Sequence, residues 1–266
     1  MKIAILTGCA NGIGRHITGV LLQQGYAVTA TDVAVSQLHQ VAISHKWPTD
    51  RLLLLPLDVR SPADWQRAIS DTLARWGRID VGMNIAGVIR PGYAADIRPE
   101  DIDFMVDINL KGVMLGTRYL AEVMKKQGAG HIINIASLAG IAPIQGLGIY
   151  SATKFAVRAF SLAAAGELRA QSVAVSVVCP DLVDTNMLTL QLDYPEAALT
   201  FSGNRTLTVD DVSRTILREA LDRKRVEILI PNSRGWLGKF GNLFPEIGFR
   251  LTERLRKKGL KRMSEL

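Results

Sequence analysis

The chain is poor in cysteine, and its apolar runs are short. It contains two cysteines, Cys9 and Cys179, which cannot form a disulfide framework or a cysteine metal site. Two isolated thiols fit a reducing compartment, so a cytoplasmic location is expected. No stretch approaches the ~18 uninterrupted apolar residues of a membrane-spanning helix. The short apolar run 2–6 after Met1 predicts a buried strand and not a signal segment.

Histidines are also few, and nothing divides the chain internally. The four histidines show no metal-ligand clustering, so no metal site is expected. We find no internal repeat, low-complexity segment or Pro/Gly-rich linker that would mark a second domain. Hydrophobic residues make up 48% of the chain and charged residues 21%, which allows a large core and excludes wholesale disorder.

The positive charge is concentrated at the carboxyl end. The net charge is +7, and residues 234–266, with nine basic and three acidic residues, account for +6 of it. The rest of the chain is therefore nearly neutral. The basic isoelectric point describes this tail and does not indicate a nucleic-acid-binding body.

Apolar and aromatic residues are interleaved with the basic ones in this extension, taken as residues 232–266. Three interpretations stay open for it. It packs across a subunit or over a ligand pocket, it is an interfacial helix that makes a peripheral contact with anionic lipid, or it binds an acidic macromolecule. The apolar residues are Trp236, Leu237, Phe240, Leu243, Phe244, Ile247, Phe249, Leu251 and Leu255.

Strand-like apolar runs alternate with helix-period segments along most of the chain. Continuously apolar runs such as 132–135 are typical of strands covered on both faces. The alternation predicts an α/β fold, a doubly wound parallel sheet of the Rossmann type, in a single domain over residues 1–231. The predicted strands are 2–6, 26–31, 51–57, 79–85, 131–136, 173–179 and 226–230, and the predicted helices are 13–24, 34–45, 61–75, 99–126, 149–170 and 208–222.

Two of these helices carry clear start signals. Ser61 is followed by Pro62 and Asp64, which gives an N-cap, a first-turn proline and a carboxylate at the positive end of the helix dipole. Thr208 and Asp211 offer the same signature. The segment 181–207 before the second start has no clear period and is a candidate lid.

A glycine-rich segment follows the first predicted strand and opens the first predicted helix. Glycines permit a tight turn and close approach to a pyrophosphate, and a helix N-terminus supplies free N–H groups and a positive dipole end. Because the segment lies in a β-α-β unit, it predicts a dinucleotide site, with a plain strand-to-helix turn as the alternative. The expected cofactor-binding residues are Gly8, Asn11, Gly12, Ile13 and Gly14.

Asp32 ends the second predicted strand, 18 residues after Gly14. A carboxylate there can accept hydrogen bonds from both ribose hydroxyls of an adenosine and would repel a 2′-phosphate. No Lys or Arg follows closely, and Ala10 and Asn11 are uncharged, so NAD is expected and not NADP. The alternative is that Asp32 only caps the next helix.

Tyr150 and Lys154 are four residues apart in a predicted helix and therefore share one face. A nearby ammonium favours the phenolate, so we expect Lys154 to lower the pKa of Tyr150 from its usual value of about 10. Such a tyrosine can act as a general acid or base. Ser137 follows the strand 131–136 at its carboxyl end, where open α/β sheets bind ligands, and its hydroxyl can hold a substrate oxygen.

Taken together, the glycine pattern, the Asn84-Ile85-Ala86-Gly87 segment, Ser137 and the Tyr150/Lys154 pair resemble the short-chain dehydrogenase/reductase family. The resemblance covers about residues 1–231. It implies a single Rossmann-type domain with a seven-stranded parallel sheet, in a homodimer or homotetramer. It also implies that Lys154 holds the nicotinamide ribose.

The resemblance implies further site residues. Asn109 matches the fourth catalytic residue, which helps hold a proton-relay water, whereas by itself it reads as a polar residue inside a helix. Asp58, with Val59 beside it, matches the carboxylate next to the adenine, and its alternative is a cap for the helix at Ser61.

Two more segments carry over. Asn84, Ala86 and Gly87 match a family segment that supports the sheet and the cofactor, and Ile85 replaces its second asparagine. Residues 180–185 match the Pro-Gly-x-x-x-Thr segment that touches the nicotinamide. Val183 and Thr185 are the expected contacts there, and Asp181 replaces the usual glycine.

The sequence therefore predicts an NAD-dependent alcohol dehydrogenase or ketone reductase. Tyr150 would exchange a proton with the substrate oxygen, Ser137 would orient that oxygen, and Asn109 would support the relay. Apolar residues in 186–205 favour a lipophilic substrate, although a lid can also turn them toward the core. A non-catalytic, cofactor-sensing membrane- or partner-binding module is the alternative, and the intact catalytic set argues against it.

Overall fold

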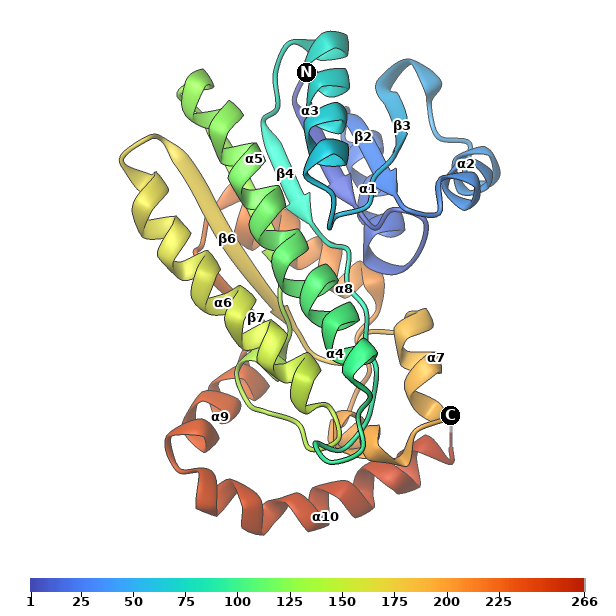
Figure 1. The fold of residues 1–266 in the computed structure, drawn as a ribbon, viewed down its shortest axis with the longest axis vertical. Coiled ribbons are helices and arrows are strands. Elements are labelled where there is room, and N and C mark those ends of the chain that lie inside the picture. The colour runs from blue at the N-terminus through green and yellow to red at the C-terminus, as the bar shows by residue number, and fades with distance from the viewer. Residues whose placement is uncertain (266) are drawn as a thin grey trace.

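The chain folds around one seven-stranded sheet. The computed structural model describes residues 1–265, and the side chains of 247–251 lie outside what is described. All neighbouring strands are parallel, in the order β3-β2-β1-β4-β5-β6-β7, with helices on both faces (Figure 1). The strands are β1 (Ile3–Thr7), β2 (Ala27–Asp32), β3 (Leu52–Pro56), β4 (Val81–Asn84), β5 (Gly130–Ile135), β6 (Val173–Pro180) and β7 (Glu227–Ile230). The predicted doubly wound Rossmann sheet is confirmed.

The helices follow the predicted alternation with strands. Two π-helical stretches continue α4 and α8, namely η2 (Asp107–Lys111) and η5 (Ile216–Asp222). The short 3-10 helices are η1 (Thr49–Arg51), η3 (Leu138–Gly140) and η4 (Pro195–Ser202). The α-helices are α1 (Gly12–Gln23), α2 (Val35–Ser44), α3 (Pro62–Trp76), α4 (Pro99–Val106), α5 (Gly112–Gln127), α6 (Gly148–Arg169), α7 (Asn186–Leu192), α8 (Val209–Thr215), α9 (Asn232–Leu243) and α10 (Pro245–Met263).

The central strands are buried on both faces, which explains their continuous apolar runs. Successive side chains of a strand point to opposite faces. Leu6 of β1 therefore packs with Ile17 on one side of the sheet, and Ile5 packs with Trp65 on the other. This two-sided burial fixes the sheet between two helical layers.

Both predicted helix starts are confirmed. The Ser61 hydroxyl accepts a hydrogen bond from the Asp64 N–H at 3.2 Å. Thr208 and Asp211 form a complete capping box at the start of α8. Both arrangements use residues three apart, so sequence alone can specify them.

The predicted lid segment, 181–207, is regular over much of its length. It contains α7 and the 3-10 helix η4. Phe201 is fully buried in a cluster with Leu147 and Tyr150, so part of the apolar content of this segment forms core. Other residues of the segment line the cavity described below.

The carboxyl-terminal extension forms two helices that wrap the base of the molecule (Figure 1). α10 packs against η4, where Gly259 lies so close to the Ala198 carbonyl that a Cβ would clash with it. Lys258 donates to Asn204 at 2.6 Å, and Arg262 donates to Thr206 at 2.9 Å. α10 therefore packs on the rest of the protein, as in the packing interpretation of the extension.

α9 leaves an apolar stripe uncovered in the described chain. Its other side rests on β7, where Gly235 approaches Leu229. Ile247, Phe249 and Leu251, which the sequence assigned to the same apolar set, lie outside the described side chains. No helix among the described residues is long and apolar enough to cross a membrane. The exposed stripe consists of Trp236, Leu237, Phe240, Leu243 and Phe244.

Deletion of residues 250–266 tests what the extension does. Because Gly259 packs on η4 and Lys258 and Arg262 bond the segment that follows it, the deletion should lower the melting temperature by about 2–8 °C, the shift expected from losing one or two kcal/mol. Anionic vesicles, sedimented with the protein at low and high salt, test the lipid interpretation in parallel.

The vesicle experiment decides whether the extension binds lipid. Salt-sensitive co-sedimentation that is lost in a Trp236→Ser, Phe240→Ser variant would place lipid contact on α9. An unchanged melting temperature after the deletion would contradict the bracing role of α10.

Candidate active site

One cavity brings most of the predicted site residues together. It has a volume of about 520 Å³ and lies at the carboxyl ends of the central strands, where the strand order reverses between β1 and β4. The predicted residues on its wall are Gly8, Asn11, Gly12, Ile13, Gly14, Asp32, Asp58, Val59, Ala86, Gly87, Ser137, Tyr150, Lys154, Val183 and Thr185.

The glycine-rich loop has the backbone that its sequence predicts. Gly8 and Gly12 adopt left-handed φ values of 71° and 53°, which favour glycine. A Cβ on Gly14 would clash with the Gly8 carbonyl, so α1 packs directly on the loop. Asn11 is the N-cap residue of α1, and its side chain makes no capping bond. The open cradle beside a helix N-terminus suits a pyrophosphate.

Asp32 ties this loop to β2. One carboxylate oxygen accepts from the Ala10 N–H at 2.9 Å, and the other accepts from the Ala34 N–H at 2.9 Å. The second bond lies just before α2, whose N-cap residue is Ala34, so Asp32 does not itself cap this helix. Asp32 also lines the cavity, and its hydrogen bonding to an adenosine ribose stays a prediction.

Asp58 is paired with Arg60, a cavity residue that the sequence reasoning missed. The Arg60 Nε lies 2.9 and 3.1 Å from the two carboxylate oxygens, and its Nη2 lies 2.6 Å from one of them. Hydrogen bonds from Arg60 lower the pKa of Asp58. The Asp58 side chain does not cap α3, because Ser61 does so. An arginine two residues after Asp58 was the available signal.

Thr7 connects the glycine-rich loop to the end of β4 through hydrogen bonds. Its hydroxyl accepts from the Ile85 N–H at 2.9 Å and from the Ala86 N–H at 3.1 Å. The Gly8 backbone approaches Ala86 so closely that a Cβ would lie 3.0 Å from its Cα. The two strand ends therefore form one continuous wall of the cavity.

Asn84 lies behind this wall. Its side-chain amide donates to Asn134 at 2.8 Å and to Thr117 at 3.3 Å, in a buried network between β4, β5 and α5. Asn84 is not among the cavity residues. The Asn84 side chain therefore supports the sheet layer, and its predicted contact with a cofactor stays a prediction.

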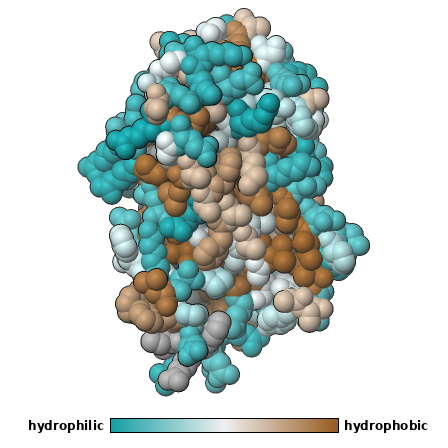
Figure 2. Space-filling model, turned by 60° about the vertical axis from the view of Figure 1, so that its left-hand side comes forward, coloured by the Kyte–Doolittle hydropathy of each residue, from teal (hydrophilic) through white to brown (hydrophobic). Residues whose placement is uncertain are grey.

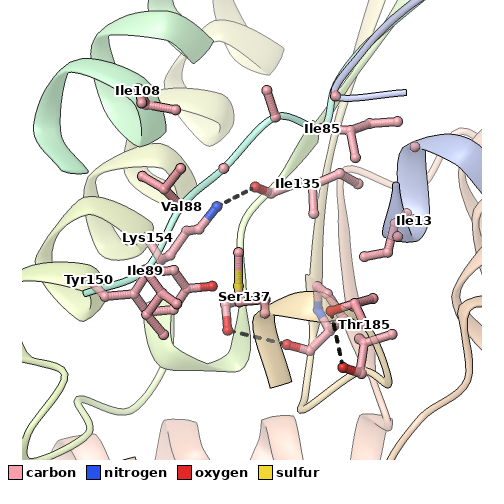
Figure 3. A pocket seen from close by; sticks show the side chains of 18 of the residues that line it. Ile13, Ile85, Val88, Ile89, Ile108, Ile135, Ser137, Tyr150, Lys154 and Thr185 are labelled. Atoms are coloured by element: carbon pink, nitrogen blue, oxygen red, sulfur yellow. Dashed lines mark hydrogen bonds between the residues drawn. The ribbon is translucent and has the colours of Figure 1, made fainter. Parts of the chain in front are cut away.

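Ser137, Tyr150 and Lys154 converge at one end of the cavity (Figure 3). The Ser137 hydroxyl donates to the Pro180 carbonyl at 3.3 Å and accepts from the Ala139 N–H at 3.1 Å. The Lys154 Nζ donates to the Ile135 carbonyl at 3.0 Å and lies 5.6 Å from the centre of the Tyr150 ring. The spacing of four residues on α6 does place both side chains on one face.

The shifts of the two pKa values are set by burial. Burial raises the pKa of Tyr150 to about 12, and a hydrogen bond with Ser137 opposes the rise. Burial also lowers the pKa of Lys154 to about 8. The predicted lowering of the Tyr150 pKa is therefore wrong as a net effect. Spacing shows that the ammonium is near, but it does not show how strongly burial disfavours the phenolate.

Asn109 lies on the π-helical stretch η2 and is fully buried. Its amide donates to the Val88 carbonyl at 2.8 Å, and its oxygen accepts from the Val88 N–H at 2.8 Å. It is not on the cavity wall. Asn109 thus holds the backbone of Val88, next to Gly87. The relay role that the family resemblance implies for Asn109 stays a prediction.

Asp181, which replaces the usual glycine of the family pattern, forms an ion pair with Arg234 of the carboxyl-terminal extension. Its carboxylate lies 3.0 Å from the Arg234 Nε of α9. Burial raises the pKa of Asp181, and the charge of Arg234 opposes the rise. The Asp181 N–H donates to the Ile230 carbonyl at 2.8 Å, which continues the β6–β7 pairing. The side chain of Asp181 is therefore held by α9 and its backbone by β7, at the start of the segment that leads to Val183 and Thr185.

The rest of the cavity wall is mainly apolar, and most of its members outside the lid segment were not predicted. Gln191 and Thr200 are the polar exceptions from that segment. The apolar residues near the catalytic set are Ile89, Phe104, Ile144, Leu147, Leu182, Met187 and Leu188.

Comparison with known proteins gives consistent relatives. Residues 2–193 match the family model for short chain dehydrogenase. The NADP-dependent 3-hydroxy acid dehydrogenase YdfG of Escherichia coli is 34% identical, over 80% of this chain and 87% of its own. Cyclopentanol dehydrogenase of Comamonas testosteroni is 31% identical, over 81% and 88%.

A solved structure extends the match to the whole fold. A short chain dehydrogenase/reductase from Burkholderia phymatum, in complex with NAD, aligns with a TM-score of 0.82 and 25% identity, covering 93% of this chain and 95% of that one. Given the cavity, the sheet and a family match over most of its length, this chain belongs to the short-chain dehydrogenase/reductase family of oxidoreductases.

Proposed function

We propose that the protein interconverts an uncharged secondary alcohol and its ketone with NAD as the cofactor. The observation that carries this proposal is the convergence of Ser137, Tyr150 and Lys154 at one end of a cavity whose other end is the glycine-rich loop. A non-catalytic sensing module would not need this set, and alcohol dehydrogenases among the relatives favour catalysis.

The chain's residues divide the proton chemistry between them. In oxidation, the Tyr150 oxygen takes the proton of the substrate hydroxyl, and in reduction it returns that proton. The Ser137 hydroxyl holds the same substrate oxygen, and the Lys154 ammonium stabilises negative charge on Tyr150. A bound nicotinamide would supply the hydride chemistry. Lys154, Val183 and Thr185 would hold it.

The charges on the cavity wall favour NAD over NADP. Asp32 places a carboxylate at the end of β2. The cationic residues on the described wall are Arg60, which Asp58 already pairs, and Lys154, which lies at the catalytic end. A 2′-phosphate would therefore meet a carboxylate and no free cation.

The charges on the cavity wall also favour an uncharged substrate. Asp181 is the charged residue on the wall beside the apolar group, and Arg234 pairs with it. A hydroxy acid, such as the substrate class named for YdfG, would bring a carboxylate into an apolar wall without a free cation. Burying an unpaired carboxylate is costly, whereas a cyclic or long-chain alcohol fits.

We also propose a homo-oligomer. Figure 2 shows tan and brown side chains gathered over the middle of the face that carries α5 and α6. Small side chains let two helices approach closely, so this face can pack on a second copy. The exposed small residues of α6 are Ala152, Ala159, Ala163 and Gly166.

For its location, we propose the cytoplasm, with α9 as a peripheral lipid contact. Cys9 and Cys179 are both free and buried, as expected in a reducing compartment. The extension combines the exposed apolar stripe of α9 with the basic residues of α10, and this composition suits an anionic surface.

Replacement of Tyr150 by phenylalanine tests the proposed function. The ring is kept and the proton-transferring hydroxyl is lost, so kcat with secondary alcohols should fall by about 10²–10⁴-fold. NADH binding, followed by fluorescence, should stay within a factor of two or so of the wild type. A variant that keeps most of the wild-type rate would refute the role of Tyr150.

Replacement of Lys154 by methionine tests the charge effect. The ammonium lowers the free energy of the phenolate, so its loss should raise the pKa of Tyr150 further. The rising limb of kcat/KM for alcohol oxidation should therefore move to higher pH, with a lower rate between about pH 7 and 9. Lys154→Arg, which stays charged over this range, is the matched control. A profile unchanged in Lys154→Met would show that Lys154 does not tune Tyr150.

Replacement of Asp32 by asparagine tests the cofactor choice. The wild type should prefer NAD over NADP by at least about tenfold in kcat/KM, which corresponds to ~1.4 kcal/mol. Asparagine keeps an acceptor for one of the Ala10 and Ala34 N–H groups but removes the charge, so the preference should narrow. Comparable kcat/KM values for the two cofactors in the wild type would overturn the NAD assignment.

A further inference from the structure

Each helix of the extension sends one arginine to the region where the segment 181–185 begins. The Arg234 Nε of α9 lies 3.0 Å from the carboxylate of Asp181, whose side chain is 10% exposed. The Arg234 guanidinium also lies against Gly203, because a Cβ on that glycine would overlap it. Arg262 of α10 donates to the Gly203 carbonyl. This cluster of charges therefore joins the extension to the start of the segment.

The rest of the segment forms part of the cavity. The Asp184 N–H donates to the Leu207 carbonyl at 2.8 Å, and the Leu207 N–H donates to the Leu182 carbonyl at 2.9 Å. At the far end, Thr185 faces the glycine-rich loop so closely that a Cβ on Gly12 would lie 3.3 Å from the Thr185 methyl group. The position of the segment therefore sets the width of the cavity beside the glycine-rich loop.

Asp181 depends on its partner for a stable charge. Burial raises the pKa of Asp181, and the charges of Arg234 and Arg262 oppose the rise. Removing one partner of such a pair leaves a charge that nothing compensates. Without Arg234, the carboxylate is stabilised by moving toward water. Because Asp181 precedes Val183 by two residues and Thr185 by four, that movement displaces both cavity residues.

We propose that Asp181 and Arg234 form a positioning pair, which holds Val183 and Thr185 in place for the nicotinamide end of the cofactor. This inference rests on the cofactor contacts in the proposed function. Where the family pattern has a glycine, this chain has a carboxylate that its own carboxyl-terminal extension holds. The extension therefore acts on cofactor affinity, although none of its described residues lines the cavity.

The test measures the binding of NADH and of ADP-ribose to the full chain by calorimetry. ADP-ribose keeps the adenosine, the pyrophosphate and the second ribose but lacks the nicotinamide. Arg234→Met removes the cation, so it should raise the Kd of NADH by about tenfold and change the Kd of ADP-ribose by less than about twofold. Equal losses for the two ligands would indicate a general structural role and overturn the proposal, as would an unchanged Kd for NADH.

Asp181→Asn completes a double-mutant cycle. It keeps the shape of the side chain and the N–H that bonds to Ile230, and it should weaken NADH binding in the same direction but less, because Arg234 can still reach solvent. The double variant should bind NADH no more weakly than Arg234→Met alone, since both changes break one interaction. Fully additive losses would overturn the pairing. If Arg234→Met does not fold, the comparison of NADH with ADP-ribose in Asp181→Asn decides.

Lys239→Met is the matched control on the same helix. Lys239 also pairs with a carboxylate, that of Glu227 on β7, and Glu227 keeps Arg158 as a second partner. The control should change the Kd of NADH by less than about twofold. A loss as large as that of Arg234→Met would show that any loosening of α9 weakens binding, which overturns the assignment to Asp181 and Arg234. The expected binding pattern in a protein that turns over no alcohol would reject the proposed function but support the positioning pair.

Discussion

A buried lysine ammonium is the constraint on which the active site depends. Lys154 is 3% exposed, and its Nζ is held by the Ile135 carbonyl at the end of β5. Burial disfavours its charge and also disfavours a Tyr150 phenolate, so each group needs the other if charge is to form in the cavity.

Apart from Asp32, whose carboxylate accepts from backbone N–H groups, the remaining charges of the cavity occur in pairs that also join segments of the chain. Asp58 and Arg60 fix the turn after β3, and Asp181 with Arg234 joins the end of β6 to α9. Pairing leaves little free charge on the wall, and this is why both an uncharged substrate and a cofactor without a 2′-phosphate fit. The extension thus supports a charged residue of the cavity through Arg234, even though its helices lie at the base of the molecule.

The parts of the structure that were predictable depend on local spacing. The glycine-rich loop, the Ser61 cap and the Thr208 capping box each depend on neighbours within a few residues, and alternation of strands and helices specified the sheet. What depends on burial or on distant partners was not predictable. The direction of the Tyr150 pKa shift and the inward-facing amide of Asn84 both follow from packing between segments far apart in sequence.

The π-helical stretch η2 has a consequence for the long helix that contains it. Met105 and Val113 are both buried, although eight steps of about 100° would turn them about 80° apart on a regular helix. The wide turn at η2 absorbs one residue, which leaves seven effective steps and brings the two within about 20° of one face. Asn109 is the side chain that gains from this phase correction, since it points inward while α4 and α5 keep their apolar faces aligned. Loss of a single residue beside Asn109 would restore a regular helix and keep the two apolar faces aligned, but it would remove the wide turn that brings the Asn109 amide to Val88.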